Sequence, residues 1–312
     1  MATVSASGIT LHQFSFSSMG CPCALQVEAD ATTAQRAVAA VQAEVDRLDR
    51  KYSHYRDDSL VAMIGASADA GDGIDVDAET ADLIDFAATL HAQSEGRFDI
   101  TAGALTKTWD LLSGRIPDHA ALEAARARCG WQRVVWKRPH LRLPVPGMRL
   151  DLGGVVKEYA ADRAARLCRE VGAEHGVVDL GGDLAVVGPH VDGSPWIAGI
   201  TSPRTPGSAI ARIELGSGGL ATSGDYERVM IVDGRRYSHI IDPVSGWPVE
   251  SFASVSVVAA SCLVAGAAST LAMLMGVAHG EEWLDVLGLP YLCVAADGRV
   301  AGTLAPAGAG AA

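Results

Sequence analysis

The chain has 312 residues, a formal net charge of −12, 49% hydrophobic residues and 20% charged residues. These proportions are typical of a folded, soluble globular protein and exclude a disordered chain or a fibrous repeat. The acidic balance argues against a nucleic-acid partner, because neutralising phosphates requires a basic face and the Lys and Arg residues form no long run.

The N-terminus has neither the basic nor the apolar region of an export signal. The six cysteines follow no disulfide framework, and only Cys21 and Cys23 are close in sequence. We therefore expect a reducing compartment, the cytoplasm. If the natural protein carries an export signal ahead of Met1, the expectation changes to the periplasm.

The first half of the chain alternates strands and helices. Residues 10–29 alternate in polarity and predict two strands joined by a turn at 19–22. Val38, Val41, Val45 and Leu48 recur at helical spacing and predict a helix that ends near Ser53. Further predictions are a helix over 78–94, a loop over 97–101, a short helix near 120–129, and strands at 133–136 and 148–151.

The tetrapeptide Asp-Leu-Gly-Gly occurs twice, at 151–154 and 179–182, each time after a predicted strand. Two small residues let backbone amides approach a phosphate or a flat ring, and the carboxylate can accept from a ribose hydroxyl. A tight turn with a capping aspartate is the plainer interpretation, and both remain open. An amphipathic helix over 159–171 and strands at 177–180 and 184–187 accompany the two copies.

The C-terminal half reads mostly as strands, predicted at 196–201, 209–215, 229–232, 237–241, 255–259 and 291–295. Asp233-Gly234 predicts a type I′ hairpin turn. The apolar stretch Cys262–Ala278 is shorter than the ~20 residues that a bilayer requires, so it predicts a buried helix and no membrane span. We expect a single domain of two lobes over 1–304 and a disordered Ala-, Gly- and Pro-rich tail over 305–312.

Two further segments carry polar chemistry. Thr222, Ser223 and their small neighbours can hold a phosphate at a strand end, and Tyr226 can pack on an aromatic ring. His239 would lie partly buried in the predicted strand 237–241. It is either a paired structural histidine or a functional residue, that is, a flavin contact or a proton carrier.

Taken together and in order, these segments resemble the ApbE family over about residues 14–276. The motifs that carry the resemblance are Met19-Gly20, Ser53-His54-Tyr55, Gly96–Thr101, both Asp-Leu-Gly-Gly copies, Lys157 with Tyr159–Asp162, Thr222–Arg228 and His239–Pro243. The last two are the most specific.

The resemblance implies a mixed α/β (α+β) fold of two lobes with FAD in a cleft between them. It implies an FAD site lined by Met19, Tyr55, Arg97, Phe98, Asp99, Asp151, Lys157, Thr222 and His239. To these we add the glycine turn Gly181-Gly182, Ser223 and Tyr226, and we predict His239 and Asp242 as the catalytic residues.

The family transfers FMN from FAD to a Thr or Ser hydroxyl of an acceptor flavoprotein, commonly a subunit of an electron-transfer or reductase system. By resemblance a Mg²⁺ ion would be held by the Gly154 carbonyl and by the Asp and Thr of an Ala-Asp-x-x-x-Thr helix. In this chain Thr270 is kept, but Gly266 stands where the Asp belongs.

Two other departures are Glu158, in place of a glycine, and Gly65, in place of an asparagine. Mg²⁺ relies on one or two carboxylates, so its binding requires a substitute such as Glu158 or Asp225. The alternative hypothesis is an FAD-binding protein that has lost or changed the transferase chemistry.

Overall fold

An eight-stranded sheet, in which every hydrogen-bonded neighbour is antiparallel, forms the centre of the molecule. A computed structural model describes residues 8–205 and 207–306. The strand order is β1-β2-β6-β7-β10-β15-β16-β17. These strands are β1 (Thr10–Ser18), β2 (Cys21–Ala29), β6 (His175–Leu180), β7 (Asp183–Gly188), β10 (Gly219–Gly224), β15 (Phe252–Ala259), β16 (Tyr291–Ala295) and β17 (Val300–Ala301).

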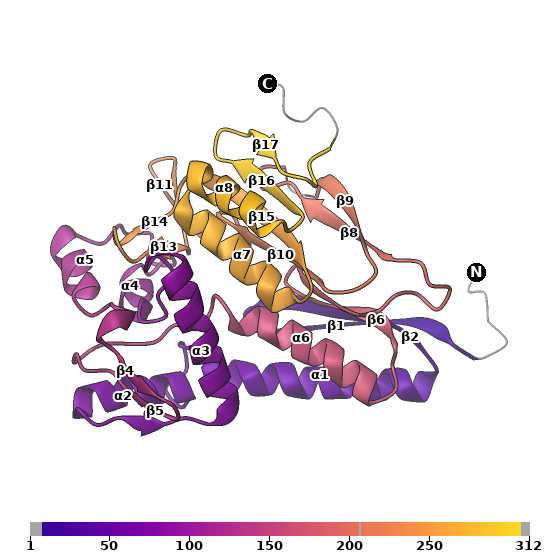
Figure 1. Cartoon of the computed structure of the whole chain (residues 1–312), viewed down its shortest axis with the longest axis horizontal. Helices are drawn as coiled ribbons and strands as arrows, with labels where there is room; N and C mark the ends of the chain where they lie inside the picture. The colour runs from indigo at the N-terminus through magenta and orange to yellow at the C-terminus, as the bar shows by residue number, and fades with distance from the viewer. Residues whose placement is uncertain (1–7, 206, 307–312) are drawn as a thin grey trace.

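Helices cover one face of this sheet (Figure 1). They are α1 (Ala31–Tyr52), α6 (Val156–Glu170), α7 (Cys262–Met275) and α8 (Val277–Leu287). α1 begins where the Asp30 side chain accepts from the amides of Thr32 and Thr33, a standard N-cap, and it buries the predicted apolar stripe. The opposite face packs against the hairpin of β8 (Trp196–Thr201) and β9 (Ala209–Leu215).

A second group of elements gathers at one end of α1 (Figure 1). It comprises α2 (Leu60–Ala70), α3 (Ala78–Gln93), α4 (Gly103–Thr108), α5 (His119–Arg126), the 3₁₀ turn η1 (Trp131–Arg133), β3 (Ile74–Asp75), β4 (Val135–Lys137) and β5 (His140–Arg142). The short hairpins β11 (Val229–Val232) with β12 (Arg235–Ser238), and β13 (Ile241–Asp242) with β14 (Trp247–Pro248), lie beside it. One apolar core runs from α2 and α3 through α1 to the sheet and α7.

The mixed α/β class is confirmed, together with most predicted elements. Three predicted elements are wrong in detail. Residues 148–151 form no strand, only an isolated bridge between Ala102 and Arg149. The strand predicted over 237–241 is broken, because the amide of His239 donates to the carbonyl of Arg228 and the amide of Ile240 donates to Ser238. The apolar stretch is two helices that meet at Gly276.

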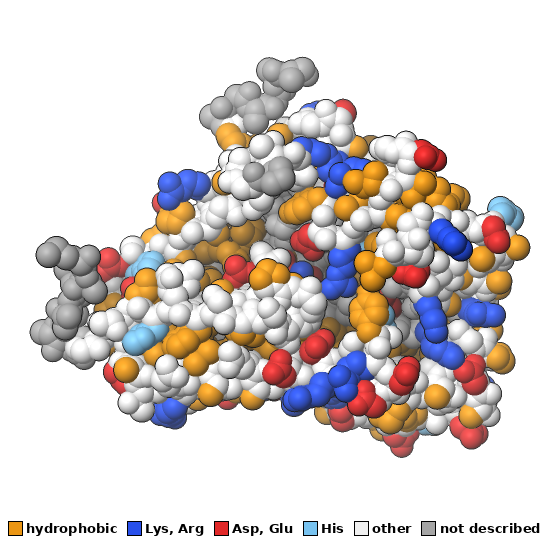
Figure 2. All heavy atoms as spheres, turned by 180° about the vertical axis from the view of Figure 1, so that it is seen from behind, with side chains coloured by type: hydrophobic (Ala, Val, Ile, Leu, Met, Phe, Trp, Pro, Cys, Tyr) orange, Lys and Arg blue, Asp and Glu red, His pale blue; other side chains and the backbone are white. Residues whose placement is uncertain are grey.

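Two helices, α2 and α4, are absent from the sequence prediction, and residues 307–312 of the predicted tail lie outside the described residues. Within the described part of the chain, no helix combines the length and hydropathy needed to cross a bilayer. Acidic and basic side chains are interspersed over the face of the molecule shown in Figure 2.

Candidate functional site

The second Asp-Leu-Gly-Gly copy makes the tight turn between β6 and β7. Leu180 pairs with Asp183, so the turn consists of Gly181 and Gly182, with φ angles of 67° and 93°. Two positive φ angles define a type I′ turn, which glycine adopts without strain. A methyl group at Gly181 would lie 2.9 Å from the Cys21 Sγ and 3.9 Å from the Lys157 Nζ. The turn therefore brings its backbone next to an ammonium group.

Lys157, in the first turn of α6, is held by an ion pair with Asp183 at 2.9 Å between Nζ and Oδ2. The Glu227 carboxylate is 4.0 Å from the same nitrogen. Burial alone would lower the pKa of Lys157, but Asp183 and Glu227 outweigh it and hold the pKa above its ordinary value. The lysine is therefore a fixed positive charge at the end of the sheet.

Strand β10 adds hydroxyl groups to the corner of the molecule that contains Lys157, Asp183 and the Gly181-Gly182 turn. The amide of Thr222 donates to Asp183, and its hydroxyl lies 2.7 Å from the hydroxyl of Ser256. The Ser223 hydroxyl lies 2.9 Å from that of Thr270 on α7, so the structure brings a predicted flavin residue and a predicted metal ligand together. The Tyr226 ring folds back toward Gly224, where an added methyl group would lie 2.8 Å from its Cδ1.

His239 is connected to this corner by hydrogen bonds of Arg228. The Arg228 guanidinium donates to the carbonyl of Met19, and the Arg228 carbonyl accepts from the His239 amide. Burial, and then the charge of Arg228, lower the pKa of His239 to about 4. Its Nδ1 is buried and has no hydrogen-bond partner among the described residues. The imidazole is neutral at pH 7 and has an unused ring nitrogen.

The first Asp-Leu-Gly-Gly copy lies in the loop before α6 and faces His54. The Nδ1 of His54 is 3.4 Å from the Asp151 Oδ1, which also accepts from the amide of Gly153. Burial alone would raise the pKa of Asp151, but His54 outweighs it and holds the pKa at about 2. The Tyr55 ring beside His54 is 75% exposed. It is therefore open to a ligand.

The Arg97–Asp99 segment has a more structural role than predicted. Arg97 lies 3.4 Å from Asp242, whose carboxylate also caps its own turn by accepting from the amides of Val244 and Ser245. Phe98 packs with its Cε2 3.1 Å from where a methyl group on Gly154 would lie. The Asp99 side chain is 4% exposed and accepts from Thr101 and the amide of Trp131. Its contacts hold the loop and leave little surface for a ligand.

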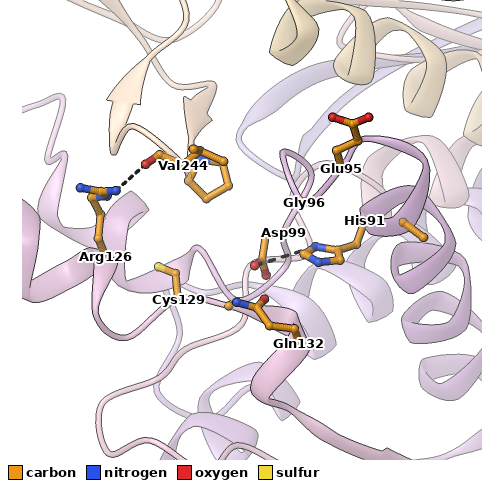
Figure 3. Close-up of a pocket in the computed structure, with 11 residues that line it drawn as sticks. His91, Glu95, Gly96, Asp99, Arg126, Cys129, Gln132 and Val244 are labelled. Atoms are coloured by element: carbon orange, nitrogen blue, oxygen red, sulfur yellow. Dashed lines mark hydrogen bonds and ion pairs between the residues drawn. The ribbon is translucent and has the colours of Figure 1, made fainter.

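A hollow of about 580 Å³ lies beside this segment rather than at Lys157 (Figure 3). It is lined by α3, α5 and the turn after Asp242, and its labelled residues include His91, Arg126 and Gln132. Asp99 is the one residue that it shares with the predicted flavin set. We place the candidate site at Lys157 instead, because the predicted residues Gly181 and Thr222 and the buried charge of Asp183 meet there.

Sequence reasoning missed Asp183 and Glu227, the carboxylates that hold Lys157. The signal that could have found Asp183 was its position as a charged residue directly after the Gly181-Gly182 turn, inside an otherwise apolar run. Glu158 was named from the sequence as a departure from the family and as one of two candidate substitutes for the missing carboxylate. It is 6% exposed, and burial, followed by the charge of Asp183, raises its pKa to about 8.

Comparisons with known proteins identify the family of the chain. The model of the ApbE family matches residues 19–292. The chain is 32% identical to an FAD:protein FMN transferase of Salmonella typhimurium over 280 residues, 86% of this chain and 80% of that protein. It is 31% identical to one of Escherichia coli K12 over 268 residues, 83% of this chain and 76% of that protein.

Two solved structures have the same architecture. The ApbE protein of Thermotoga maritima superposes with a TM-score of 0.85 at 30% identity, covering 94% of this chain and 97% of that one. The flavin transferase ApbE of Vibrio cholerae superposes with a TM-score of 0.82 at 27% identity, with the same coverage. The family match spans most of the chain and the relatives pass 30% identity over most of their length. The chain therefore belongs to the ApbE family.

Proposed function

We propose that this chain transfers FMN from FAD to a Thr or Ser hydroxyl of an acceptor flavoprotein. Its relatives carry the name of that activity. One observation supports the proposal most strongly: Lys157 lies next to both the Gly181-Gly182 turn and the Asp183–Thr222 contact. A fixed ammonium beside a turn of two glycines, which have no side chains to crowd a ligand, suits the pyrophosphate of a dinucleotide. The exposed Tyr55 ring suits its flat ring system.

In the proposed reaction the acceptor oxygen attacks the phosphorus that carries the FMN half. The new O–P bond forms while the pyrophosphate P–O bond breaks, and AMP leaves with that electron pair. The hydroxyl proton passes to His239, which is neutral at pH 7 and has an unpartnered Nδ1. The contacts of Asp242, the second predicted catalytic residue, support a role in holding Arg97.

A Mg²⁺ ion, when bound, would neutralise charge that develops on the pyrophosphate. The Thr270 hydroxyl and the Gly154 carbonyl are the oxygens proposed to hold it. Among residues 8–205 and 207–306, no group of three His, Cys, Asp or Glu side chains could form a cage. A site of few carboxylates, completed by hydroxyls, carbonyls and substrate phosphates, suits Mg²⁺.

The proposed acceptor is a flavoprotein subunit of an electron-transfer or reductase system. The alternative function is FAD binding without transfer, and the observation that favours it is the missing carboxylate at Gly266. The two functions differ in whether the bound FAD is cleaved.

The test is to incubate the protein with FAD, Mg²⁺ and a candidate flavoprotein, measuring acceptor mass and AMP release. We expect an acceptor heavier by one FMN and an equal amount of AMP. Bound FAD with neither product would support the alternative. Absence of any FAD affinity in a fluorescence titration would contradict both functions.

The variant His239→Asn tests the proposed proton acceptor. We expect the transfer rate to fall by about 10²–10⁴-fold, the usual contribution of a general base. The affinity for FAD should change only a few-fold, because the fixed charge of Lys157 remains. His119→Asn, on an exposed helix end away from this corner, is the matched control. Equal rates for the two variants would remove His239 from the mechanism.

A further inference from the structure

Glu158 fills the space that a side chain at position 266 would occupy. Glu158 lies in the first turn of α6, and Gly266 lies on α7, which packs against it. A methyl group built on Gly266 would lie 2.6 Å from the Glu158 Oε1 and 2.8 Å from its Cδ. Real Cβ atoms essentially never come so close, so the Glu158 side chain would have to shift. The carboxylate of Glu158 therefore reaches the place where an Asp at 266 would begin.

This carboxylate is buried without a partner. Glu158 is 6% exposed, and its Oε2 makes no hydrogen bond with any described residue. Buried carboxylates in proteins are paired, protonated or bound to metal ions, because an isolated charge in a low-dielectric interior is costly. A bound cation would supply the partner for Oε2 that the described residues do not provide.

The surroundings favour a cation as that partner. Asp183, 2% exposed, and Glu227 lie on the same side, and Lys157 is the nearby ammonium that both carboxylates share. Glu158 is a third carboxylate whose charge acts on the same lysine. Thr270 lies four residues after Gly266, on the same face of α7. Its hydroxyl reaches Ser223, so this corner contains oxygen donors of the kind that hard cations prefer.

The other candidate carboxylate is already engaged. Both oxygens of Asp225 accept from the Arg204 guanidinium at 2.7 Å in a bidentate pair. Such a pair is strong and geometrically fixed. Asp225 is therefore unsuitable as a substitute.

We propose that the Glu158 carboxylate is a ligand of the divalent cation, bound between α6 and α7 with the Thr270 hydroxyl. The chain thus carries the metal-binding carboxylate on α6 instead of α7. The role of the ion in catalysis rests on the proposed function. Metal binding, however, is measured separately from FMN transfer, so the failure of one can be told from the failure of the other.

The test measures Mn²⁺ binding to the full chain without FAD, by the EPR signal of free Mn²⁺ and by calorimetry. We expect Glu158→Gln, which keeps the shape and removes the charge, to weaken Mn²⁺ binding tenfold or more. Glu170→Gln on the exposed end of α6 is the matched control and should bind like the wild type. Equal affinity in Glu158→Gln and wild type, or no Mn²⁺ binding by the wild type, would overturn the proposal.

A paired variant keeps the test decisive if Glu158→Gln does not fold. Glu158→Gly combined with Gly266→Asp moves the carboxylate to α7 and removes the overlap between the two positions. We expect it to fold and to recover Mn²⁺ affinity to within a few-fold of wild type. Gly266→Asp alone should lower the thermal midpoint, because Glu158 occupies its space. A folded paired variant that binds no Mn²⁺ would contradict the proposal.

Discussion

The two Asp-Leu-Gly-Gly copies have one sequence and two conformations. In the copy at 179–182, the tetrapeptide ends β6 and both glycines have positive φ. In the copy at 151–154, it lies in a loop before α6, and neither glycine has φ in the left-handed region. Each copy buries its leucine. The aspartate accepts from an amide two residues ahead in the loop and three residues ahead in the hairpin turn.

The difference follows from what each copy is attached to. The second copy continues into β7, which returns along β6, so two residues must reverse the chain. The first copy continues into α6, and its backbone follows a helical entry instead. The glycines are required for conformation in the second copy, whereas in the first Gly154 matters for the space around Phe98.

The largest effect that we expect is from Gly181→Ala. Its positive φ and the overlap with Cys21 should together lower the free energy of unfolding by about 2–4 kcal/mol. Urea unfolding measures this change in the free energy of unfolding. Gly182→Ala is the matched control, since its φ is positive but no atom of the described residues lies within 4 Å of the added methyl group, and we expect a loss of about 1 kcal/mol. Equal losses would show that contact with Cys21 is unimportant.

The two aspartates should respond oppositely to pH. The pKa of Asp151 in the folded state, about 2, is below its unfolded value, so its contribution is present at neutral pH and is lost as pH falls from about 4 towards 2. Asp151→Asn should therefore lower the free energy of unfolding by about 2 kcal/mol at pH 7, and by less as the pH is lowered. Burial raises the pKa of Asp179, so its ionised form opposes folding above the folded-state pKa.

Asp179→Asn is thus the matched variant, because its amide oxygen can still accept from Gly182. We expect no loss of stability at pH 7. Any gain should shrink as the solution is acidified, because the wild-type carboxyl is then protonated. Urea unfolding from pH 7 to pH 3 measures both variants. If both lost stability equally, the environments of the two copies would not differ as the structure indicates.

Sequence reasoning predicted the elements that depend on local pattern. The alternation over 10–29, the apolar stripe of α1 and the turn at Asp233-Gly234 are all confirmed, because each depends on neighbours within a few residues. The strand predicted at 148–151 was wrong because its local pattern looked like a strand but tertiary packing decided its conformation. Its apolar residues lie buried in a loop. Among the described residues, its only strand-like pairing is the bridge between Arg149 and Ala102.

The candidate site was predictable only as a set of separate motifs. The contact between Glu158 and Gly266 joins two helices separated by more than ninety residues, and periodicity carries no information about it. The ion pair of Lys157 with Asp183 likewise depends on how α6 crosses β7. Pairing of buried charges is decided by tertiary packing, so the sequence identified the residues but not their partners.

The smallest effect that we expect is from Gly154→Ala, which tests whether the first copy needs glycine for conformation. The φ angle is compatible with alanine, and the added methyl group meets only the edge of the Phe98 ring at 3.1 Å. A shift of that ring should hold the loss of stability to about 1 kcal/mol or less. Thermal unfolding measures this, and FAD titration should show affinity weakened a few-fold because Phe98 belongs to the predicted flavin set. A loss as large as that of Gly181→Ala would mean that the two copies share a conformational requirement, and the contrast between them would fail.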